Sequence, residues 1–498
     1  MFKVARVDPL TPDVVSRLRD ALRSAGYAYD GVAGLLGPTA HAALSRNETT
    51  PGLRATRGGS PLETLVRLWL LQAPVSVQAA ERALPGLVDG LCSADLLARD
   101  GDEVRARVDV RPYADEGADW WVVSDLTPGL DGAPIRVGAD HVLGISSAST
   151  SLAQLTVRQP VGRALDLGTG CGVQALHLAE HVDDIVATDV NERALAMTRL
   201  NAVLNEVRLD VRAGSLFEPV AEELFDLVVT NPPFVVSPAT GERLVYRDSG
   251  LPGDEMVRRV VTEAPRHLNP GGWCQVLANW EHRRGEPWQQ RVEGWLDGSG
   301  CDAWVVQREV ADLAEYVELW LKDAGVHGRP DYAERYDAWL SWFDEHGIEA
   351  VGFGWLHLRR VDRAPVLHIE EWPYDVEQPL GREVVDRGRR TDLLAATDDD
   401  ALLATRLVTR VDVRQETVGE PGAADPETIV LRQQRGMRRA RQADTVEAGL
   451  VGACDGDLTV GQILDALGSL VGEDPAVLRR DRLPDVRTLV ADGFLDLV

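Results

Sequence analysis

The chain of 498 residues is strongly acidic, because 79 Asp and Glu residues against 52 Lys and Arg residues give a formal net charge of −27. Since domains average about 150 residues, we expect two to four of them. Generic binding to nucleic acids or anionic membranes needs a basic surface, so the overall charge argues against both. The negative net charge still allows a local basic patch.

Cysteines and histidines give no sign of a structural metal or of disulfides. The five cysteines are far apart and form no C-x-x-C pair, and the ten histidines show no H-E-x-x-H spacing, so we predict no metal. The first residues, MFKVARVDPLTPD, lack the apolar core of a signal peptide, and no segment approaches the roughly 20 apolar residues of a membrane span. We expect a cytoplasmic protein in a reducing compartment.

The N-terminal part, residues 1–113, has the pattern of a small helical module. Apolar residues recur at helical spacing in several segments between residues 14 and 101, and residues 103–113 alternate polar and apolar positions. Short helices followed by such a ribbon resemble a winged helix. Its candidate recognition segment, residues 76–91, is not basic, so we favour protein contact or plain packing over nucleic-acid binding.

The central part, residues 120–361, alternates β-rich runs with helical segments, which is typical of a parallel sheet with crossover helices. We predict seven strands, at residues 164–168, 184–190, 209–214, 226–234, 273–280, 301–309 and 351–361.

Two further regions follow. Residues 362–430 are polar and rich in turn formers, which indicates an accessory β or linker region. Residues 431–498 return to helical patterns, as in a second module of helical or winged type. Within the latter, residues 432–442 hold five arginines. A solvated helix face is the simpler explanation, and a dock for an anionic partner such as RNA, through the Arg432 to Arg441 region, is the alternative.

A glycine-rich turn follows the first central strand in LDLGTGCG, residues 165–172. Gly168 and Gly170 let the backbone approach a ligand closely, and the carboxyl ends of parallel strands are where such folds bind ligands. Asp189 ends the next strand 21 residues after Gly168, the distance at which a carboxylate holds a ribose diol. Asp166 lies inside the strand, where the G-x-G-x-x-G nicotinamide enzymes have an apolar residue, so we disfavour a nicotinamide cofactor.

The fourth central strand ends in Asn231, Pro232, Pro233 and Phe234. Successive prolines make a stiff turn and present acceptors, because neither has an N–H. The Asn231 side-chain oxygen and the Pro232 carbonyl can each accept one N–H of a planar NH₂ group, and Phe234 can stack on that group. Such a turn catalyses by positioning and by stabilising charge on nitrogen.

Together the two motifs resemble class I S-adenosylmethionine-dependent methyltransferases of the amino-methylating N-P-P-[FY] branch, which includes release-factor glutamine and small-subunit rRNA guanine methyltransferases. The resemblance covers about residues 140–280 and implies a Rossmann-like seven-stranded sheet, with S-adenosylmethionine as cofactor. It implies catalytic roles for Asn231, Pro232, Pro233 and Phe234, and cofactor contacts for Asp166, Gly168, Thr169, Gly170, Asp189, Val190, Asn191, Ser215, Leu216 and Asn231. Ser215 stands where the superfamily often has an acidic residue.

Two further features are candidates for substrate or cofactor contact. Ser147, Ser149, Thr150 and Gln154 precede the first central strand, where a helix N-cap explains the hydroxyl groups equally well. Trp280, at the end of the fifth strand, could line the acceptor cleft, whereas we expect Trp288, Trp295 and Trp304 to be core residues.

We therefore predict an N-methyltransferase that modifies a glutamine-like amide of a protein or peptide, with the flanking modules selecting the substrate. The alternative is a base N-methyltransferase acting on rRNA or tRNA, which would flip a base to Asn231. A small-molecule methyltransferase and a non-catalytic scaffold are less favoured. The acidic net charge tilts the choice toward a protein substrate.

Overall fold

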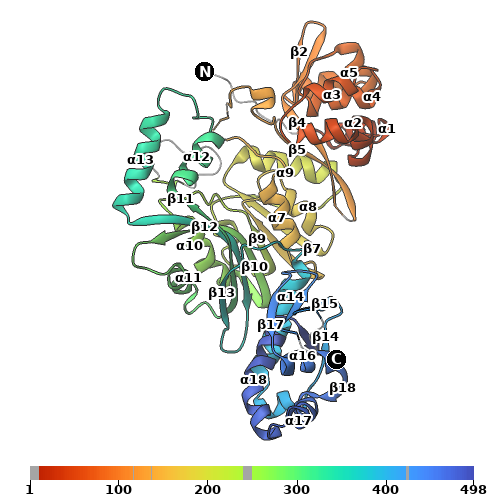
Figure 1. Cartoon of the computed structure of the whole chain (residues 1–498). Coiled ribbons are helices and arrows are strands. Elements are labelled where there is room, and N and C mark those ends of the chain that lie inside the picture. Colours follow the sequence, from red (N-terminus) through yellow and green to blue (C-terminus); the bar gives the residue numbers. More distant parts are fainter. Residues whose placement is uncertain are drawn as a thin grey trace. The chain divides into compact units, whose positions relative to one another are not determined.

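The computed structural model describes residues 10–115, 117–135, 137–138, 140–238, 250–421 and 426–497 (Figure 1). The chain divides into two compact units. The first comprises residues 1–153 and 159–372, and the second comprises residues 154–158 and 373–498. None of the helices in the described ranges has the length and hydropathy needed to cross a membrane.

The N-terminal part of the first unit is helical, with a small antiparallel sheet of strand order β1-β3-β2. One helix start is well capped, because Ser60 and Glu63 form the reciprocal capping box. The winged-helix assignment stays a prediction. The elements are α1 (Pro12–Ser24), α2 (Tyr29–Leu44), α3 (Thr50–Ala55), α4 (Pro61–Leu65), the π-helical turn η1 (Val66–Leu70), β1 (Val75–Ser76), α5 (Val77–Ala83), α6 (Val88–Ser93), β2 (Leu97–Asp100) and β3 (Glu103–Ala106).

A hairpin of β4 (Val108–Asp115) and β5 (Ala118–Asp125) joins this part to the central sheet. Two asparagines of α9 (Glu192–Leu204) and its C-cap bind the outer edge of β5. The Asn201 side chain accepts from Val123 N–H at 2.7 Å and donates to Val123 O at 2.9 Å, and Asn205 Oδ1 accepts from Trp121 N–H at 2.9 Å. Hydrophobic residues of the N-terminal helices, the hairpin and α9 share one core.

The central sheet has eight strands in the order β13-β11-β12-β10-β9-β6-β7-β8. The strands from β10 through β8 are parallel to one another, and β12 runs antiparallel to both of its neighbours. All seven predicted strands are present, and β13 is an eighth. The strands are β6 (Val161–Leu167), β7 (Val182–Asp189), β8 (Asp210–Ala213), β9 (Phe225–Thr230), β10 (Leu268–Arg283), β11 (Cys301–Asp312), β12 (Ile348–Arg360) and β13 (Leu367–Glu371).

The central strands form because their apolar runs are buried against crossover helices. Leu165, Val186, Val228 and Val276 are at most 1% exposed and belong to one core. Between β11 and β12 the chain inserts a helical hairpin of α12 (Leu313–Asp323) and α13 (Tyr332–Glu345) (Figure 1). The remaining helices are α7 (Ser147–Leu155), α8 (Val173–Leu178), α10 (Glu255–Glu263) and α11 (Trp288–Leu296).

The second unit has two small antiparallel sheets, β18-β14-β19 and β15-β16-β17, packed with helices. Its elements are α14 (Gly381–Ala396), α15 (Asp399–Ala404), β14 (Arg406–Thr409), β15 (Val413–Val418), β16 (Thr428–Gln433), β17 (Ala440–Ala443), α16 (Thr445–Ala453), β18 (Asp455–Thr459), α17 (Val460–Val471), α18 (Pro475–Ala491) and β19 (Leu495–Leu497).

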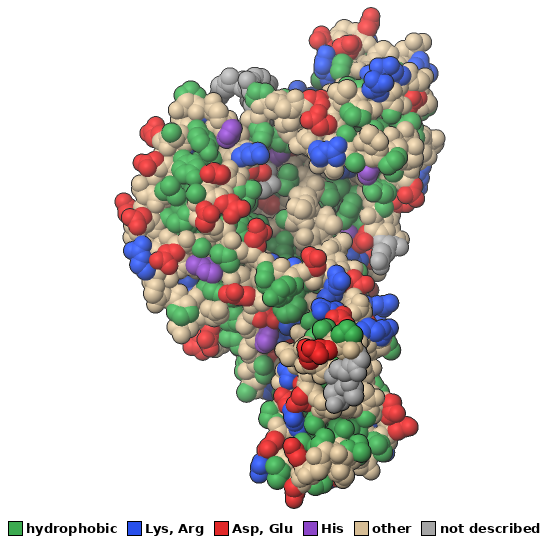
Figure 2. All heavy atoms as spheres, viewed as in Figure 1, with side chains coloured by type: hydrophobic (Ala, Val, Ile, Leu, Met, Phe, Trp, Pro, Cys, Tyr) green, Lys and Arg blue, Asp and Glu red, His purple; other side chains and the backbone are tan. Residues whose placement is uncertain are grey.

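The arginine-rich stretch is not helical, which corrects the helix-face interpretation. Residues 432–442 run from β16 through a turn into β17, and most of their charge is neutralised inside the unit. Arg432 pairs with Glu416 at 2.8 Å, and Arg441 with Glu447 and Asp485. On the face drawn in Figure 2, acidic and basic side chains are interspersed.

Candidate active site

The glycine turn after β6 adopts the backbone that its sequence predicts. Gly168, Gly170 and Gly172 have φ of +75°, +58° and +86°, a region that other residues rarely adopt. A Cβ at Gly168 or Gly170 would meet no heavy atom within 4 Å among the described residues, whereas one at Gly172 would meet Thr198 at 3.2 Å. The first two glycines therefore face open space, which suits close approach of a ligand, and Gly172 is needed for packing.

Asp166 stabilises this turn through hydrogen bonds. Its side chain is buried, and Oδ2 accepts from Thr169 Oγ1 at 2.6 Å and from Ala175 N–H at 3.1 Å. Burial, helped by the nearby Asp189, raises the pKa of Asp166 from 3.8 to about 7. The observed contacts hold the strand, the turn and α8 together, and a contact of Asp166 with the cofactor stays a prediction.

Asp189 ends β7 beside the glycine turn. Its Oδ2 accepts from Gly170 N–H at 2.9 Å and its Oδ1 from Asn191 N–H at 2.8 Å, and burial raises its pKa. Asn191 caps α9 by accepting from Arg193 N–H at 3.0 Å. Val190 between them is 68% exposed, which is unusual for a valine and gives a flat ligand an apolar surface.

The predicted cofactor contacts of Ser215 and Leu216 lie in the turn after β8. Ser215 is exposed, and its carbonyl accepts from Glu218 N–H. Leu216 has a φ of +48°, a strained conformation for a residue with a Cβ, and such strain is concentrated at ligand sites. The turn thus carries the backbone strain expected of a binding loop.

The turn of residues 231–234, called the acceptor turn below, begins where β9 ends. Thr230 Oγ1 donates to Leu167 O at 2.7 Å, which fixes the end of β9 against β6. The next side chain, Asn231, has its Oδ1 buried without a hydrogen-bond partner among the described residues. Buried carbonyl oxygens are nearly always satisfied, so this one is a candidate site for a donor that the described residues do not provide.

The chain after the turn is held by α12. Pro232 is buried, and the partly buried ring of Phe234 makes an edge contact with Trp320, with ring centroids 6.3 Å apart. Val236 N–H donates to Tyr316 Oη at 2.8 Å, and Asn279 Nδ2 donates to the same oxygen at 3.2 Å. Sequence reasoning missed Tyr316 and Asn279, because neither belongs to a local motif.

The two further candidates have different outcomes. Ser149 Oγ accepts from Ser146 N–H at 2.8 Å and Thr150 Oγ1 donates to Ser146 O at 3.0 Å, so the hydroxyl groups organise the start of α7. Ligand contacts of Ser147, Ser149, Thr150 and Gln154 stay a prediction. The interpretation of Trp280 as a cleft residue is wrong, because its side chain is 0% exposed, donates to Gln307 Oε1 at 2.9 Å and stacks on Trp288.

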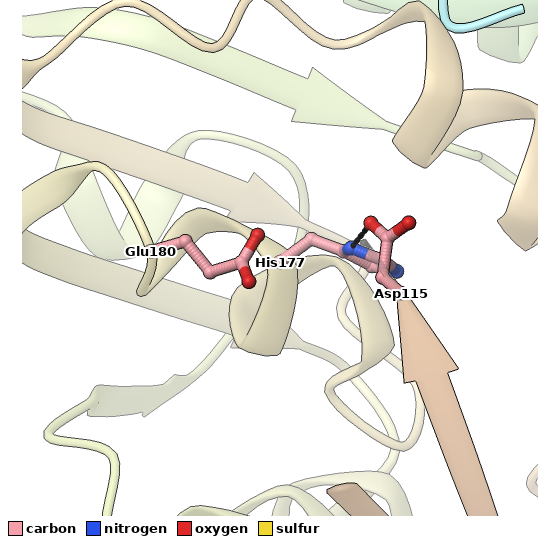
Figure 3. A group of neighbouring side chains, drawn as sticks. All are labelled: Asp115, His177 and Glu180. Carbon is pink, nitrogen blue, oxygen red and sulfur yellow. Dashed lines mark ion pairs between the residues drawn. The ribbon is translucent and has the colours of Figure 1, made fainter. Parts of the chain in front are cut away.

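Among the residues that the structure describes, one group of side chains outside this site has metal-ligating chemistry. Asp115, His177 and Glu180 each offer a ligand atom, and these atoms lie within 4.8 Å of one another (Figure 3). His177 Nδ1 lies 3.2 Å from Asp115 Oδ2, and its Nε2 lies 3.0 Å from Tyr113 Oη. Both ring nitrogens thus have a partner within the chain, so these contacts explain the cluster as a link between β4 and α8.

Two parts of the chain match known family models. Residues 144–290 match the methyltransferase small domain, and residues 24–107 match a domain of unknown function. The first match confirms the predicted resemblance to methyltransferases, the Rossmann-like sheet and S-adenosylmethionine as the cofactor, and the domain bounds of 120–361 stay a prediction.

Curated relatives carry two kinds of name. The chain is 35% identical to a release factor glutamine methyltransferase of Geobacter sulfurreducens (22% of this chain, 43% of the relative). It is 30% identical to a ribosomal protein uL3 glutamine methyltransferase of Bradyrhizobium diazoefficiens (31% and 52%), and 32% identical to the ribosomal RNA small subunit methyltransferase C of Alcanivorax borkumensis (27% and 35%). The chain thus spans about half or less of these relatives' lengths.

Among solved structures, a 16S rRNA methyltransferase of T. thermophilus, in complex with AdoMet and guanosine, matches at 18% identity and a TM-score of 0.26, over 45% of this chain and 58% of that one.

Proposed function

We propose that the methyltransferase domain of this chain transfers a methyl group from S-adenosylmethionine to the side-chain amide nitrogen of a glutamine in a protein substrate. The observation that carries the proposal is the buried Oδ1 of Asn231, at the carboxyl end of β9 and next to the two prolines, which has no hydrogen-bond partner in the described part of the chain. An amide NH₂ is the donor group that this acceptor lacks.

The cofactor's binding residues surround the glycine turn. Gly168 and Gly170 leave room for the amino acid portion of the cofactor. Asp189 can accept hydrogen bonds from both hydroxyl groups of its ribose. The exposed face of Val190 suits the adenine ring. When bound, the cofactor supplies an electrophilic methyl group on a sulfonium.

The acceptor turn orients the nitrogen that is methylated. With one amide N–H on Asn231 Oδ1 and the other on the Pro232 carbonyl, both N–H bonds lie in the plane of the turn, and one face of the nitrogen is left open. As positive charge develops on nitrogen, both oxygens are already oriented toward it and stabilise it. No strong base is required, because the methylated nitrogen is far more acidic than a neutral amide and releases its proton to water.

Two findings favour a protein over a nucleic acid as substrate. The first relatives named above are glutamine methyltransferases. Three of the five arginines in residues 432–442 pair with acidic residues of the second unit, as Arg441 does with Glu447 and Asp485. The rRNA methyltransferase relative keeps a base amino group as the second candidate, because guanine also presents a planar NH₂.

The test is methyl transfer from labelled S-adenosylmethionine to cell fractions from a strain that lacks the gene. Soluble protein, ribosomal protein and ribosomal RNA are incubated separately with the purified chain. Label is expected in a protein fraction, and acid hydrolysis should release it as methylamine, because that treatment cleaves a methylated amide. The Asn231→Ala variant should transfer no label. Label confined to RNA, and recovered on a nucleoside after nuclease digestion, would contradict the proposal.

A further inference from the structure

A side chain of α12 binds the backbone that follows the acceptor turn. Val236 N–H donates to Tyr316 Oη at 2.8 Å, and both residues are 0% exposed. Val236 has no strand or helix neighbour to satisfy its N–H, because β9 ends at Thr230. The phenol oxygen therefore replaces the missing ladder bond at this point of the chain.

The same oxygen is also tied to β10. Asn279 Nδ2 donates to it at 3.2 Å, and Asn279 is 1% exposed. In the register of the sheet, Val276 pairs with Thr230, so Asn279 lies three residues beyond the end of β9, level with the acceptor turn. Tyr316 Oη thus joins three elements: the chain after the turn, β10 and α12.

A second contact comes from the same face of α12. Trp320 is one helical turn after Tyr316, and its ring makes the edge contact with Phe234. Tyr316 thus binds the backbone at Val236, and Trp320 contacts the ring of Phe234. The α12–α13 hairpin is an insertion between two antiparallel neighbours, β11 and β12, that need no helix to connect them.

We propose that Tyr316 is a positioning residue for methyl transfer, which sets the place of Asn231 Oδ1 and of the Phe234 ring relative to the glycine turn through its hydrogen bonds to Val236 and Asn279. The inference rests on the proposed function, in which Asn231 and Phe234 receive the methyl acceptor. A shift of about 1 Å in such a group is enough to cost about 100-fold in rate.

The test compares Tyr316→Phe with Tyr27→Phe. Tyr27 is also 0% exposed, and its hydroxyl donates to a backbone carbonyl, that of Val110, at 2.7 Å in the N-terminal part. Both variants delete one buried phenol hydroxyl and keep the ring, so both report how much stability the loss of such a hydroxyl costs. Only Tyr316→Phe releases the acceptor turn.

The first readout is kinetic and uses whichever cell fraction the wild-type chain methylates. For Tyr316→Phe we expect kcat to fall 10- to 100-fold, with the S-adenosylmethionine Kd from calorimetry within two-fold of wild type. For Tyr27→Phe we expect kcat within two-fold, at a comparable loss of Tm. Equal kcat in the two variants would overturn the inference, because the hydroxyl would then serve stability alone.

The second readout does not depend on activity. Hydrogen exchange followed by mass spectrometry should show faster exchange in a peptide that covers residues 231–238 of Tyr316→Phe, and unchanged exchange there in Tyr27→Phe. If no fraction is methylated by the wild-type chain, the proposed function fails while exchange still decides whether Tyr316 holds the turn. Unchanged exchange in Tyr316→Phe would overturn the inference even for an active enzyme.

Discussion

The backbone N–H of Gly170 donates to Asp189 Oδ2 at 2.9 Å, which ties the glycine turn after β6 to the end of the neighbouring strand β7. The other carboxylate oxygen accepts the N–H of Asn191 at 2.8 Å. A carboxylate oxygen can accept more than one hydrogen bond, so the chain orients both oxygens and leaves each able to receive a ligand hydroxyl. We therefore expect the two oxygens to bind the two hydroxyl groups of a ribose.

Replacing Asp189 should weaken cofactor binding. Hydrogen bonds to charged groups are worth about 1.5–3 kcal/mol each, so we expect Asp189→Ala to raise the S-adenosylmethionine Kd by about 100-fold in calorimetry. Asp183→Ala is the control, because Asp183 is an exposed acidic residue near the other end of the same strand. A Kd equal to that of the control would remove the ribose assignment.

Replacing Asn231 should abolish activity without loss of stability. A buried acceptor without a partner costs about 1–3 kcal/mol, and Asn231→Ala removes that acceptor, so its Tm should equal or exceed the wild-type value. Methyl transfer should fall at least 100-fold, with cofactor affinity retained. Asn269→Ala is the control at the amino end of β10, where the side chain bonds Asp226 at 2.8 Å, and it should lower Tm and keep activity. Activity retained in Asn231→Ala would refute the assigned role.

The core of the methyltransferase sheet could be predicted because its signals are local. Each of the seven strands is an apolar run bounded by turn formers, and parallel strands bring their carboxyl ends to one edge. That rule alone placed Asp189 and Asn231 near the glycine turn. Strand β13 was missed because its five residues are largely polar and lie at the sheet edge.

The remaining differences come from contacts between residues that are distant in sequence. Tyr316 follows the acceptor turn by about 80 residues, and only the inserted helical hairpin brings it back. The arginine-rich stretch lacks a helix because its two ends pair with other strands, Arg432 with Arg414 of β15 and Arg441 with Leu431 of β16. For Trp280 a local signal existed, since Cys274, Val276 and Ala278 share its face of β10 by two-residue alternation, and all are buried.

The stability of the cofactor-free protein should depend on Asp166. Burial raises the pKa of Asp166 to about 7 from 3.8, so between these pH values the folded chain holds a proton that the unfolded chain has lost. The contribution is complete below about pH 4 and is lost as pH rises through about 7. In urea unfolding, the wild type should therefore lose more stability than Asp166→Asn between pH 5 and pH 8. Parallel pH profiles for the two proteins would contradict the assignment of this proton to Asp166.

Replacing the exposed arginines of residues 432–442 distinguishes a protein substrate from an RNA substrate. Arg439 is buried and Arg441 is paired, whereas Arg435 and Arg438 have exposed side chains in the turn between β16 and β17. If the substrate is a protein amide, the double variant Arg435→Gln, Arg438→Gln should keep methyl transfer within two-fold, and RNA binding to the wild type should be weak. If the substrate is RNA, the affinity of the chain for RNA should instead fall steeply with salt concentration. The double variant should then reduce the slope of log K against log salt by about 2, which is about one for each lost phosphate contact. That result, combined with loss of transfer in the same variant, would move the chain from the glutamine to the base-modifying class.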